Sequence, residues 1–267
     1  MSAINETAFA KVNLALHVRG RLPDGRHRIE TLFAFCEDGD ALEFEPAPVI
    51  SLDIDGVDAA EIGGDNLVLR AAYALRAAAS TARGAHIRLR KHLPIAAGVG
   101  GGSADAAAAL RALVRLWDVE PALIGDVAPR LGADVPACLL SMTCRGDGAG
   151  DEVSVVQEPD LAATPILLVN PAIRLSTGDV FAHWDGTDRG PLGHWRAGRN
   201  DLEAPALQLV PQISEVLAWL RDRPGANFVR MSGSGATCFA LFDDESSRDR
   251  AAAAVPSGWW HLATRLR

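Results

Sequence analysis

The sequence lacks the features that mark membrane-spanning, secreted and nucleic-acid-binding proteins. None of the apolar runs in its 267 residues approaches the roughly 18 residues that a membrane-spanning helix requires. The first residues, MSAINETAFAKVN, contain no basic segment followed by an apolar core, so we expect no signal peptide. The formal net charge is −8, whereas a nucleic-acid-binding protein presents a basic face. These absences predict a cytoplasmic protein with no nucleic-acid partner and no membrane partner.

Cysteine is scarce, and its spacing excludes the common metal and redox motifs. The four cysteines occupy positions 36, 138, 144 and 238, and no two of them form a C-x-x-C pair. The histidines outside position 27 show no metal-ligand spacing. We therefore expect small buried thiols in a reducing compartment and no metal-ligating residues.

Apolar periodicity predicts a mixture of strands and helices. Strands are predicted over 8–18, 29–35, 41–45, 85–90, 164–170, 226–231 and 236–242, with a last strand near the C-terminal WWHLATRL. Helices are predicted over 66–79, with Asp65 as its N-cap, and over 121–131, 211–222 and 244–254. Because strands and helices do not alternate strictly, the predicted fold class is α+β. Gly, Asp, Glu and Pro collect over 147–163, which predicts a domain boundary there.

The segment LPIAAGVGGGSADAAAAL, from Leu93 to Leu110, places four glycines within five positions directly before an alanine-rich helix. Glycine costs roughly 0.5–1 kcal/mol relative to alanine in regular structure, so these glycines need another role. A glycine-rich turn at a helix N-terminus binds phosphate, because unpaired backbone N–H groups and the helix dipole face the anion. The alternative is a tight structural turn. Ser103 is predicted to be the N-cap of the helix, with Asp105 in its first turn.

The common phosphate-loop motifs do not fit this segment. No lysine follows the glycines, which excludes G-x-x-x-x-G-K-[ST], and Ser103 stands where the dinucleotide fingerprint requires Gly or Ala. The H-R-D and D-F-G elements of protein kinases are absent from the sequence. A different phosphate-binding family is therefore indicated.

Two polar residues stand out from their surroundings. Lys11 interrupts the strand predicted over 8–18, and a lysine in such a strand has a partner or lies at a sheet edge. Asp134 precedes Val135-Pro136 and fits the N-cap of a helix that begins there. On the pattern alone, a catalytic role and these structural roles are both open.

The glycine loop and five other segments resemble one known family. The pattern P-x-x-x-G-x-G-G-G-S-[SA] before an alanine-rich helix resembles the phosphate loop of the GHMP kinases. Within that family, AKVNLALHVRGRLPDGRH, ETLFAFCEDGDALEF, DNLVLRAA, LGADVPACL and SGSGATCFALF resemble, in order and spacing, the members that phosphorylate a cytidine-diphosphate sugar alcohol. The resemblance implies a two-domain GHMP kinase fold. A ribosomal-protein-S5-like domain would span residues 1–155 and a ferredoxin-like domain 156–267, with the active site in the cleft between them.

The resemblance also implies a reaction and a set of residues. The ATP γ-phosphoryl group would pass to the tertiary 2-hydroxyl of the sugar alcohol, a step of the non-mevalonate isoprenoid pathway. Asp134 would accept the hydroxyl proton, while Lys11 would hold the hydroxyl and stabilise the developing negative charge. ATP and Mg²⁺ are the expected cofactors. The ATP phosphates would be wrapped by Pro94, Ile95, Ala96, Ala97, Gly98, Val99, Gly100, Gly101, Gly102, Ser103 and Ala104, with Asn66 and Leu67 near the adenine.

The acceptor side of the implied site rests on Asn13, His27, Thr177 and Phe181. In the family, the residue at His27 hydrogen-bonds the cytosine edge and the one at Phe181 stacks on the base. Arg26 stands where the family has a tyrosine. We hypothesise that the guanidinium plane of Arg26 and the ring of Phe181 sandwich the cytosine. The alternative is a solvated arginine in a turn.

Other functions remain open at this level. The chain could be another small-molecule GHMP kinase, acting on homoserine or a sugar, or a non-catalytic ATP-binding module of the same fold. The presence of both Lys11 and Asp134 argues against such a module. The SGSGA turn, Ser232 to Ala236, either lines the phosphate site or only joins two strands. The expected partner is a small molecule, and the expected state is a monomer or a weak homodimer.

Overall fold

Two sheets organise the β structure of the chain. In the computed structural model, which describes residues 3–61 and 66–267, one sheet has the order β3-β4-β2-β5-β6, with β1 pairing to β2, and the other has the order β10-β7-β9-β8. The strands are β1 Ile4–Arg21, β2 His27–Ala47, β3 Ile50–Gly56, β4 Gly84–Lys91, β5 Cys144–Asp147, β6 Glu152–Val155, β7 Pro165–Asn170, β8 Ala226–Met231, β9 Cys238–Phe242 and β10 Trp260–Arg265.

Helices separate and cover these strands. The α-helices are α1 Leu67–Ala78, α2 Gly101–Trp117, α3 Leu123–Leu131, α4 Val135–Leu140, α5 Thr177–Ala182, α6 Glu203–Leu209, α7 Gln212–Arg221 and α8 Glu245–Ala253, with 3-10 turns η1 Ala59–Glu61 and η2 Trp195–Ala197. Within residues 3–61 and 66–267, no helix is both long enough and apolar enough to cross a membrane.

The chain divides into two compact units, each assembled from three segments. The first unit comprises Met1–Ala10, Asp38–Ile95 and Gly100–Ser141. The second comprises Lys11–Glu37, Ala96–Val99 and Met142–Arg267. The long strands β1 and β2 therefore contribute to both units. The sequence boundary expected between residues 155 and 156 stays a prediction.

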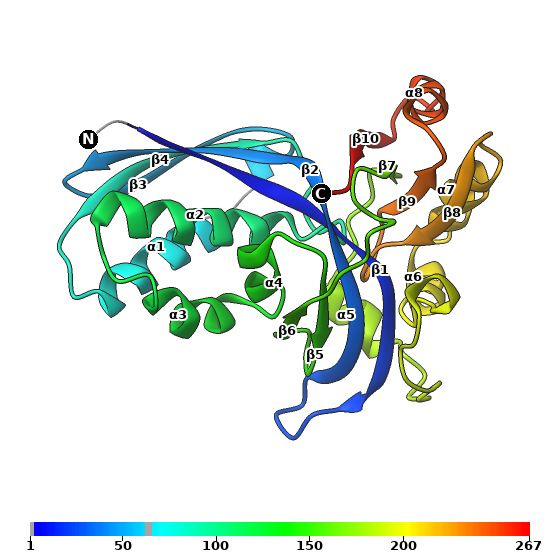
Figure 1. Cartoon of the computed structure of the whole chain (residues 1–267), viewed down its shortest axis with the longest axis horizontal. Coiled ribbons are helices and arrows are strands. Elements are labelled where there is room, and N and C mark those ends of the chain that lie inside the picture. Colours follow the sequence, from blue (N-terminus) through cyan, green and yellow to red (C-terminus); the bar gives the residue numbers. More distant parts are fainter. Residues whose placement is uncertain (1–2, 62–65) are drawn as a thin grey trace. The chain divides into compact units, whose positions relative to one another are not determined.

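In the first unit, helices cover one face of the strands. β4 pairs in parallel with β3 and antiparallel with β2, and α1 and α2 lie along one face of these strands (Figure 1). Ala85, Ile87 and Leu89 of β4 are buried, whereas Arg88 and Arg90 are exposed on the other face. This alternation confirms the strand predicted over 85–90. The alanine run of α2 is buried, and its small side chains let α1 pack closely against it.

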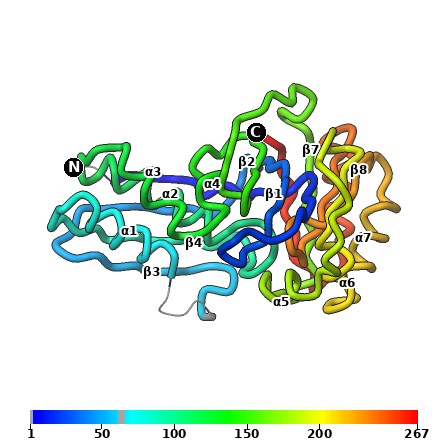
Figure 2. The backbone as a smooth tube through the Cα atoms, turned by 90° about the horizontal axis from the view of Figure 1, so that it is seen from below, coloured from blue at the N-terminus to red at the C-terminus, as the bar shows by residue number. Residues whose placement is uncertain are grey.

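In the second unit, the sheet has a ferredoxin-like arrangement. Its strands follow the order β-α-β-β-α-β along the chain, and the spatial order β10-β7-β9-β8 places the last strand beside the first. Helix α7 packs against β8 and β9, and Figure 2 shows it beside β8. Its buried stripe of Ile213, Val216, Leu217 and Leu220 confirms the helix predicted over 211–222. The predicted α+β class is confirmed by these two mixed arrangements.

One predicted break in a strand is wrong. The expected strands 29–35 and 41–45 are parts of a single strand, β2, which runs through the polar segment EDGD without turning. Gly39 lies inside β2 and does not form a turn. A Cβ at this position would lie 1.9 Å from the Ala8 carbonyl oxygen, so the position requires glycine. The glycine permits the close approach of β1. Asp40 is fully buried, and Lys91 is its ion-pair partner.

Two predicted helix starts also change. Asp65 lies outside the described residues, and Asn66 is the N-cap of α1, accepting a hydrogen bond from the Val68 N–H at 2.7 Å. The prediction that Ser103 caps α2 is wrong, because the helix begins at Gly101. Gly100 is the N-cap there, with a φ of 69° that favours glycine. Asp105 therefore lies beyond the first turn, and it is buried rather than exposed to solvent.

Candidate functional site

Lys11 lies on β1 in the second unit and is buried. Only 4% of its surface is exposed. Its Nζ donates to Asn13 Oδ1 at 2.7 Å and lies 5.2 Å from the centroid of the Phe33 ring. Lys11 and Asn13 share a face of the strand because side chains alternate with a period of two. The lysine that the sequence singled out therefore has a partner two residues away.

A buried hydrogen-bond network fixes the orientation of Asn13. Its Nδ2 donates to Thr31 Oγ1 at 2.8 Å, and that hydroxyl donates to the Ala15 carbonyl at 2.6 Å. The backbone N–H of Asn13 donates to Ser232 Oγ at 3.1 Å. Because the Asn13 amide nitrogen is engaged, its Oδ1 is left facing Lys11.

The first half of the glycine loop, Ala96–Val99, belongs to the same unit as Lys11. The Lys11 N–H donates to the Val99 carbonyl at 3.0 Å, and Ser232 Oγ donates to the Gly98 carbonyl at 2.8 Å. Gly98 has a φ of +76°, and a Cβ there would lie 2.4 Å from the Ser232 carbonyl oxygen. Ala96 also has a positive φ, of 50°. The loop backbone is thus held directly beside Lys11.

The SGSGA turn joins two strands and also lies beside Lys11, while its role at the phosphate site stays a prediction. It joins the antiparallel strands β8 and β9, and Asn200 Nδ2 donates to the Met231 and Gly233 carbonyls at 2.8 Å each. A Cβ at Gly233 would lie 3.0 Å from Asn13 Oδ1 and 3.7 Å from Lys11 Nζ. The turn therefore packs against the lysine, and a side chain at Gly233 would crowd it.

The second half of the loop, Gly100 to Ser103, forms the start of α2 in the first unit. Leu67 Cδ1 lies 3.4 Å from where a Gly102 Cβ would be, so the predicted Asn66-Leu67 segment borders this helix start. At the start of the predicted loop, directly after Pro94, the backbone N–H of Ile95 donates to Asp58 Oδ2 at 3.2 Å. The first N–H groups of a 17-residue helix can bind an anion at this point.

Asp134 occupies the N-cap position of α4, with Pro136 in the first turn, as the sequence predicted. It is half-buried, and its side chain makes no capping hydrogen bond. The turn that carries it borders the glycine loop, because a Cβ at Gly132 would lie 4.0 Å from Ser103 Oγ. Asp134 belongs to the first unit and Lys11 to the second.

Two of the predicted acceptor residues, His27 and Phe181, meet in an aromatic cluster in the second unit. His27 stacks on Phe181 with ring centroids 4.6 Å apart, and Trp184 meets His27 edge-on at 5.6 Å. Burial, followed by the charge of Arg21, lowers the pKa of His27, so its ring is neutral at pH 7. Thr177 Oγ1 lies 2.9 Å from Ser234 Oγ of the SGSGA turn.

Arg26 is held by ion pairs on the turn before β2. Its guanidinium donates to Asp24 Oδ2 and to Asp151 Oδ2, each at 2.7 Å, and about half of the side chain is exposed. The hydrogen bond that Arg26 donates to Asp151, and then the one that it donates to Asp24, raises the pKa of Arg26. The hypothesis that this guanidinium stacks on a base stays a prediction.

Sequence reasoning missed Thr31 and Trp184 as members of these groups. Thr31 is fully buried, and it interrupts an apolar strand as Lys11 does, so the same signal could have found it. Trp184 follows the end of α5 in a segment with no periodic pattern, and nothing local in the sequence distinguishes it.

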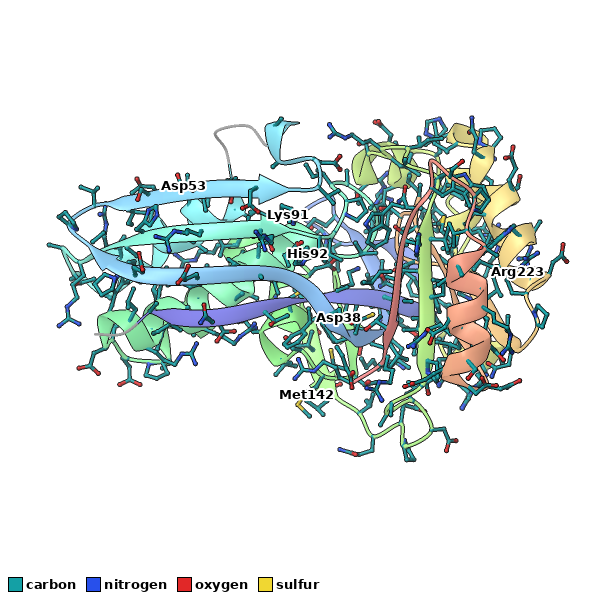
Figure 3. The ribbon with its side chains drawn as sticks, turned by 90° about the horizontal axis from the view of Figure 1, so that it is seen from above. Asp38, Asp53, Lys91, His92, Met142 and Arg223 are labelled. Carbon is teal, nitrogen blue, oxygen red and sulfur yellow. The ribbon has the colours of Figure 1, made fainter. Side chains whose placement is uncertain are left out.

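A buried charged cluster lies beneath the start of α2. Lys91, at the end of β4 beside His92 (Figure 3), forms ion pairs with Asp40 and with Asp105. Asp40 Oδ1 accepts the backbone N–H of Leu93 at 2.9 Å. The cluster therefore links two strands to the helix that follows the glycine loop.

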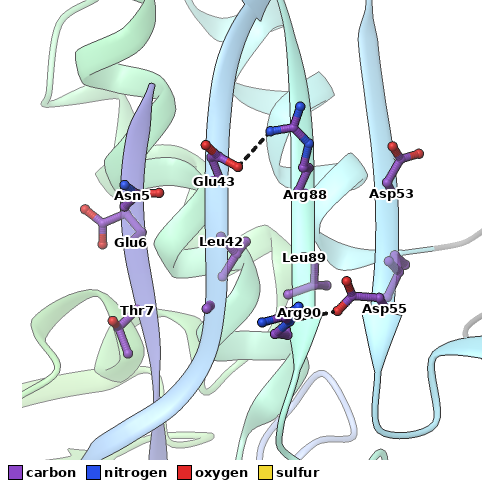
Figure 4. A pocket seen from close by; sticks show the side chains of 12 residues that line it. Asn5, Glu6, Thr7, Leu42, Glu43, Asp53, Asp55, Arg88, Leu89 and Arg90 are labelled. Atoms are coloured by element: carbon purple, nitrogen blue, oxygen red, sulfur yellow. Dashed lines mark hydrogen bonds and ion pairs between the residues drawn. The ribbon is translucent and has the colours of Figure 1, made fainter. Parts of the chain in front are cut away.

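A separate pocket lies on the open face of the first unit (Figure 4). Charged pairs cross it: Arg88 donates to Glu43 Oε2 at 2.7 Å, and Arg90 pairs with Asp55 at 3.3 Å. Its lining is Asn5, Glu6, Thr7, Ala41, Leu42, Glu43, Asp53, Ile54, Asp55, Arg88, Leu89 and Arg90. None of the predicted site residues lines this pocket.

Two family models and many known proteins match this chain. Residues 66–142 match the model for the GHMP kinases N terminal domain, and residues 187–260 match the model for GHMP kinases C terminal. A 4-diphosphocytidyl-2-C-methyl-D-erythritol kinase from Rhizorhabdus wittichii is 52% identical, over 98% of this chain and 94% of the relative. One from Novosphingobium aromaticivorans is 51% identical, over 99% and 93%.

Solved structures are similar to this chain over nearly its whole length. A crystal structure of a 4-(cytidine 5'-diphospho)-2C-methyl-D-erythritol kinase superposes with a TM-score of 0.86 at 35% identity, covering 98% of this chain and 99% of the other. A homoserine kinase from Cytophaga hutchinsonii superposes with a TM-score of 0.67 at 17% identity, over 100% and 95% of the chains, and shares the fold.

Proposed function

Because the chain belongs to the 4-diphosphocytidyl-2-C-methyl-D-erythritol kinases of the GHMP kinase family, we propose that it transfers the γ-phosphoryl group of ATP to the 2-hydroxyl of 4-diphosphocytidyl-2-C-methyl-D-erythritol. The products are the 2-phosphate and ADP, and the step supplies the non-mevalonate route to isoprenoid precursors. The single observation that carries the assignment of catalytic residues is the placement of Lys11. This buried lysine is bonded to Asn13 at 2.7 Å and through its backbone to the glycine loop at 3.0 Å.

The proposed reaction is an in-line displacement at the γ-phosphorus. The substrate hydroxyl oxygen forms the new P–O bond, the bond between the γ-phosphorus and the β–γ bridging oxygen breaks, and ADP leaves with that electron pair. Asp134 accepts the hydroxyl proton, and the Lys11 ammonium holds the hydroxyl and stabilises negative charge on the oxygens. Asn13 positions the ammonium, since its own amide is fixed by Thr31.

The glycine loop supplies the binding site for the ATP phosphates. Backbone N–H groups at the start of α2, between Gly100 and Ser103, face the anion, and the helix dipole adds to the attraction. Packing behind the loop also requires glycine: a Cβ at Gly98 would lie 2.4 Å from the Ser232 carbonyl oxygen, and a Cβ at Gly101 would lie 3.3 Å from Lys91 Nζ. The proposed role of Asn66 and Leu67 is contact with the adenine.

Mg²⁺ fits this site as an ion that is bound mainly by the ATP phosphates. Among residues 3–61 and 66–267, no group of three or more His, Cys, Asp or Glu side chains is arranged to hold a metal ion. Mg²⁺ keeps several waters and binds largely through substrate phosphates, so it needs few protein ligands. When bound together with ATP, it would neutralise negative charge on the phosphates at the glycine loop.

The proposal extends to the domain boundary, the oligomeric state and the compartment. We propose one domain over residues 1–155 and a second over 156–267. Cleavage within residues 156–164 under limited proteolysis would support that boundary. We propose a monomer or a weak homodimer, to be checked by light scattering at several concentrations. The four cysteines are buried thiols, which fits a reducing compartment such as the cytoplasm.

The first experiment is a turnover assay. The purified chain is supplied with ATP, MgCl₂ and 4-diphosphocytidyl-2-C-methyl-D-erythritol, and ADP and the 2-phosphate are quantified. Parallel reactions contain 2-C-methyl-D-erythritol, homoserine or galactose as the acceptor. Phosphorylation of the full substrate alone supports the proposal. Turnover of homoserine or a sugar would assign another kinase activity, and ATP binding without turnover of any acceptor would favour a binding module.

Variants then test the proposed roles. We expect Lys11→Met and Asp134→Asn each to lower kcat by about 100-fold or more. Asp126→Asn is the matched control, since Asp126 is an exposed carboxylate on the neighbouring helix α3, and it should retain the wild-type rate. A folded Asp134→Asn protein with near-wild-type kcat would remove Asp134 from the mechanism.

A further inference from the structure

The aromatic cluster beside α5 contains a residue that the family pattern does not include. His27 begins β2, Phe181 lies in α5, and Trp184 follows that helix by two residues. The rings of His27 and Phe181 are stacked at an interplanar angle of 24°, whereas Trp184 stands at 85° to His27. Three rings from two distant segments thus meet at one point in the second unit.

Two ring nitrogens in this cluster are buried without a partner. Within the described part of the chain, neither His27 Nε2 nor Trp184 Nε1 has a hydrogen-bond partner, and both atoms are shielded from solvent. Folded proteins rarely leave buried polar groups unsatisfied, because each such group loses its bonds to water. Two such nitrogens on contacting rings indicate a ligand that supplies the missing partners.

The chemistry of the two nitrogens defines that ligand. An indole N–H only donates, so Trp184 requires an acceptor. A neutral imidazole nitrogen accepts or donates according to its tautomer, so His27 Nε2 can hydrogen-bond either a donor or an acceptor of the ligand. The lowered pKa of His27 keeps this ring neutral at pH 7. Aromatic faces and edges favour a flat ring. A pyrimidine base, which carries acceptors and an amino donor along one edge, meets these requirements.

We propose that Trp184 is a further specificity-determining residue, whose indole N–H donates to an acceptor atom on the cytosine edge of the substrate. This inference rests on the function proposed above, since it takes the cytidine diphosphate group as the ligand. His27 pairs with the adjacent group of the same edge, and Phe181 covers the base. Trp184 thereby supplies a base contact in a chain where Arg26 replaces the tyrosine of the family pattern.

The test is the variant Trp184→Phe, which removes the N–H and keeps an aromatic ring. We expect the KM for 4-diphosphocytidyl-2-C-methyl-D-erythritol and the Kd of CDP to rise roughly 10- to 100-fold, the loss expected for one buried hydrogen bond. The kcat and the KM for ATP should stay within about twofold. Trp219→Phe is the matched control, because Trp219 packs against the same core cluster as Trp184. It should leave all four constants unchanged.

The outcomes separate this inference from the proposed function. Wild-type turnover with an unchanged KM and CDP Kd in Trp184→Phe overturns the role of Trp184 alone. A wild-type chain that neither turns over the substrate nor binds CDP overturns both. If Trp184→Phe does not fold, wild-type protein labelled with ¹⁵N-tryptophan is titrated with CDP. A downfield shift of the Trp184 indole resonance then supports the hydrogen bond, and an unmoved resonance overturns it.

Discussion

Lys91 Nζ donates to Asp105 Oδ2 at 2.7 Å, and both side chains are buried in the first compact unit. Lys11 and Lys91 are the only lysines in the sequence, and both are buried, so the exposed cationic side chains of this chain are arginines. A lysine ammonium is a compact point charge, which suits a small buried space better than a guanidinium. Lys91 uses that charge to hold two carboxylates, those of Asp40 and Asp105.

Removing the ammonium should be more damaging than neutralising one carboxylate. Lys91→Met leaves Asp40 and Asp105 buried without a counter-charge and should lower the free energy of unfolding by about 3–5 kcal/mol. Asp105→Asn keeps the Lys91–Asp40 pair and should cost only about 1–3 kcal/mol. Urea denaturation measures both. Arg88→Met, which removes exposed ion pairs with Glu43 and Glu45, is the control and should cost less than about 1 kcal/mol. Equal losses for the two buried variants would contradict this ranking.

The same cluster predicts a pH dependence of stability. Burial, opposed by Lys91 and reinforced by Asp40, raises the pKa of Asp105 to about 7. In the unfolded chain an aspartate titrates near pH 4, so between about pH 4 and 7 only the folded state holds this proton. The stability contributed by Asp105 is therefore fully present below about pH 4 and is lost as the pH rises to about 7.

Comparison of wild type with Asp105→Asn isolates this contribution. The difference in unfolding free energy between wild type and Asp105→Asn should fall as the pH is raised from 5 to 7, by at most about 1.4 kcal/mol per pH unit. Above the pKa the difference should level off. Thermal or urea unfolding in buffers of matched ionic strength measures it. A difference that does not change between pH 5 and 8 would show that Asp105 does not titrate in this range.

Elements with a regular apolar pattern could be predicted from the sequence, because the period is a local property. The strand at 85–90 and the helix at 211–222 are both found. The start of α2 could not be predicted, since Ser103 is a better capping residue than Gly100 by propensity. Gly100 is the N-cap because the chain enters the helix there with a φ of 69°. That conformation is a property of the loop, and capping propensity does not report it.

Residues of the candidate site could be predicted where a polar residue stands in an apolar segment. Lys11 stands out in an apolar strand, and the structure gives it a partner, Asn13, at 2.7 Å. Asp105 gave the opposite result: its position indicates an ordinary first-turn acid, but its partner Lys91 is 14 residues away, at the end of strand β4. Pairings across such distances depend on the tertiary fold, and no local pattern encodes them.

The network behind Lys11 predicts a catalytic effect of a residue that does not touch the substrate in the proposed mechanism. Thr31→Val keeps the shape and removes the hydroxyl that fixes Asn13. With Asn13 free to rotate, Lys11 loses its fixed acceptor, and we expect kcat to fall about tenfold while the KM for ATP stays within about twofold. Steady-state kinetics measure this split.

A matched control separates positioning from general destabilisation. Thr164→Val removes a hydroxyl that donates to the Asp160 carbonyl at 3.0 Å, outside this network. It should leave kcat unchanged, even if its melting temperature falls as far as that of Thr31→Val. If the two variants lose kcat equally, or if folded Thr31→Val retains the full rate, the positioning role of Thr31 is excluded.

Arg26 offers a test of whether a guanidinium plane can replace an aromatic ring. Its ion pairs with Asp24 and Asp151 are at the surface, where such pairs contribute little, so Arg26→Ala should change stability by less than about 1 kcal/mol. If the guanidinium stacks on cytosine, Arg26→Ala should raise the KM for the cytidine-containing substrate about tenfold without changing kcat. Arg189→Ala, which removes another exposed ion-paired arginine, should leave this KM unchanged.

Two further substitutions distinguish the plane from the charge. Arg26→Tyr provides a flat ring without charge and should restore the wild-type KM, because stacking depends on a planar surface. Arg26→Lys keeps the charge without the plane and should behave like Arg26→Ala. The reverse pattern, in which lysine restores the KM and tyrosine does not, would mean that Arg26 acts as a charge. An unchanged KM in all three variants would leave Arg26 as a turn residue held by Asp24 and Asp151.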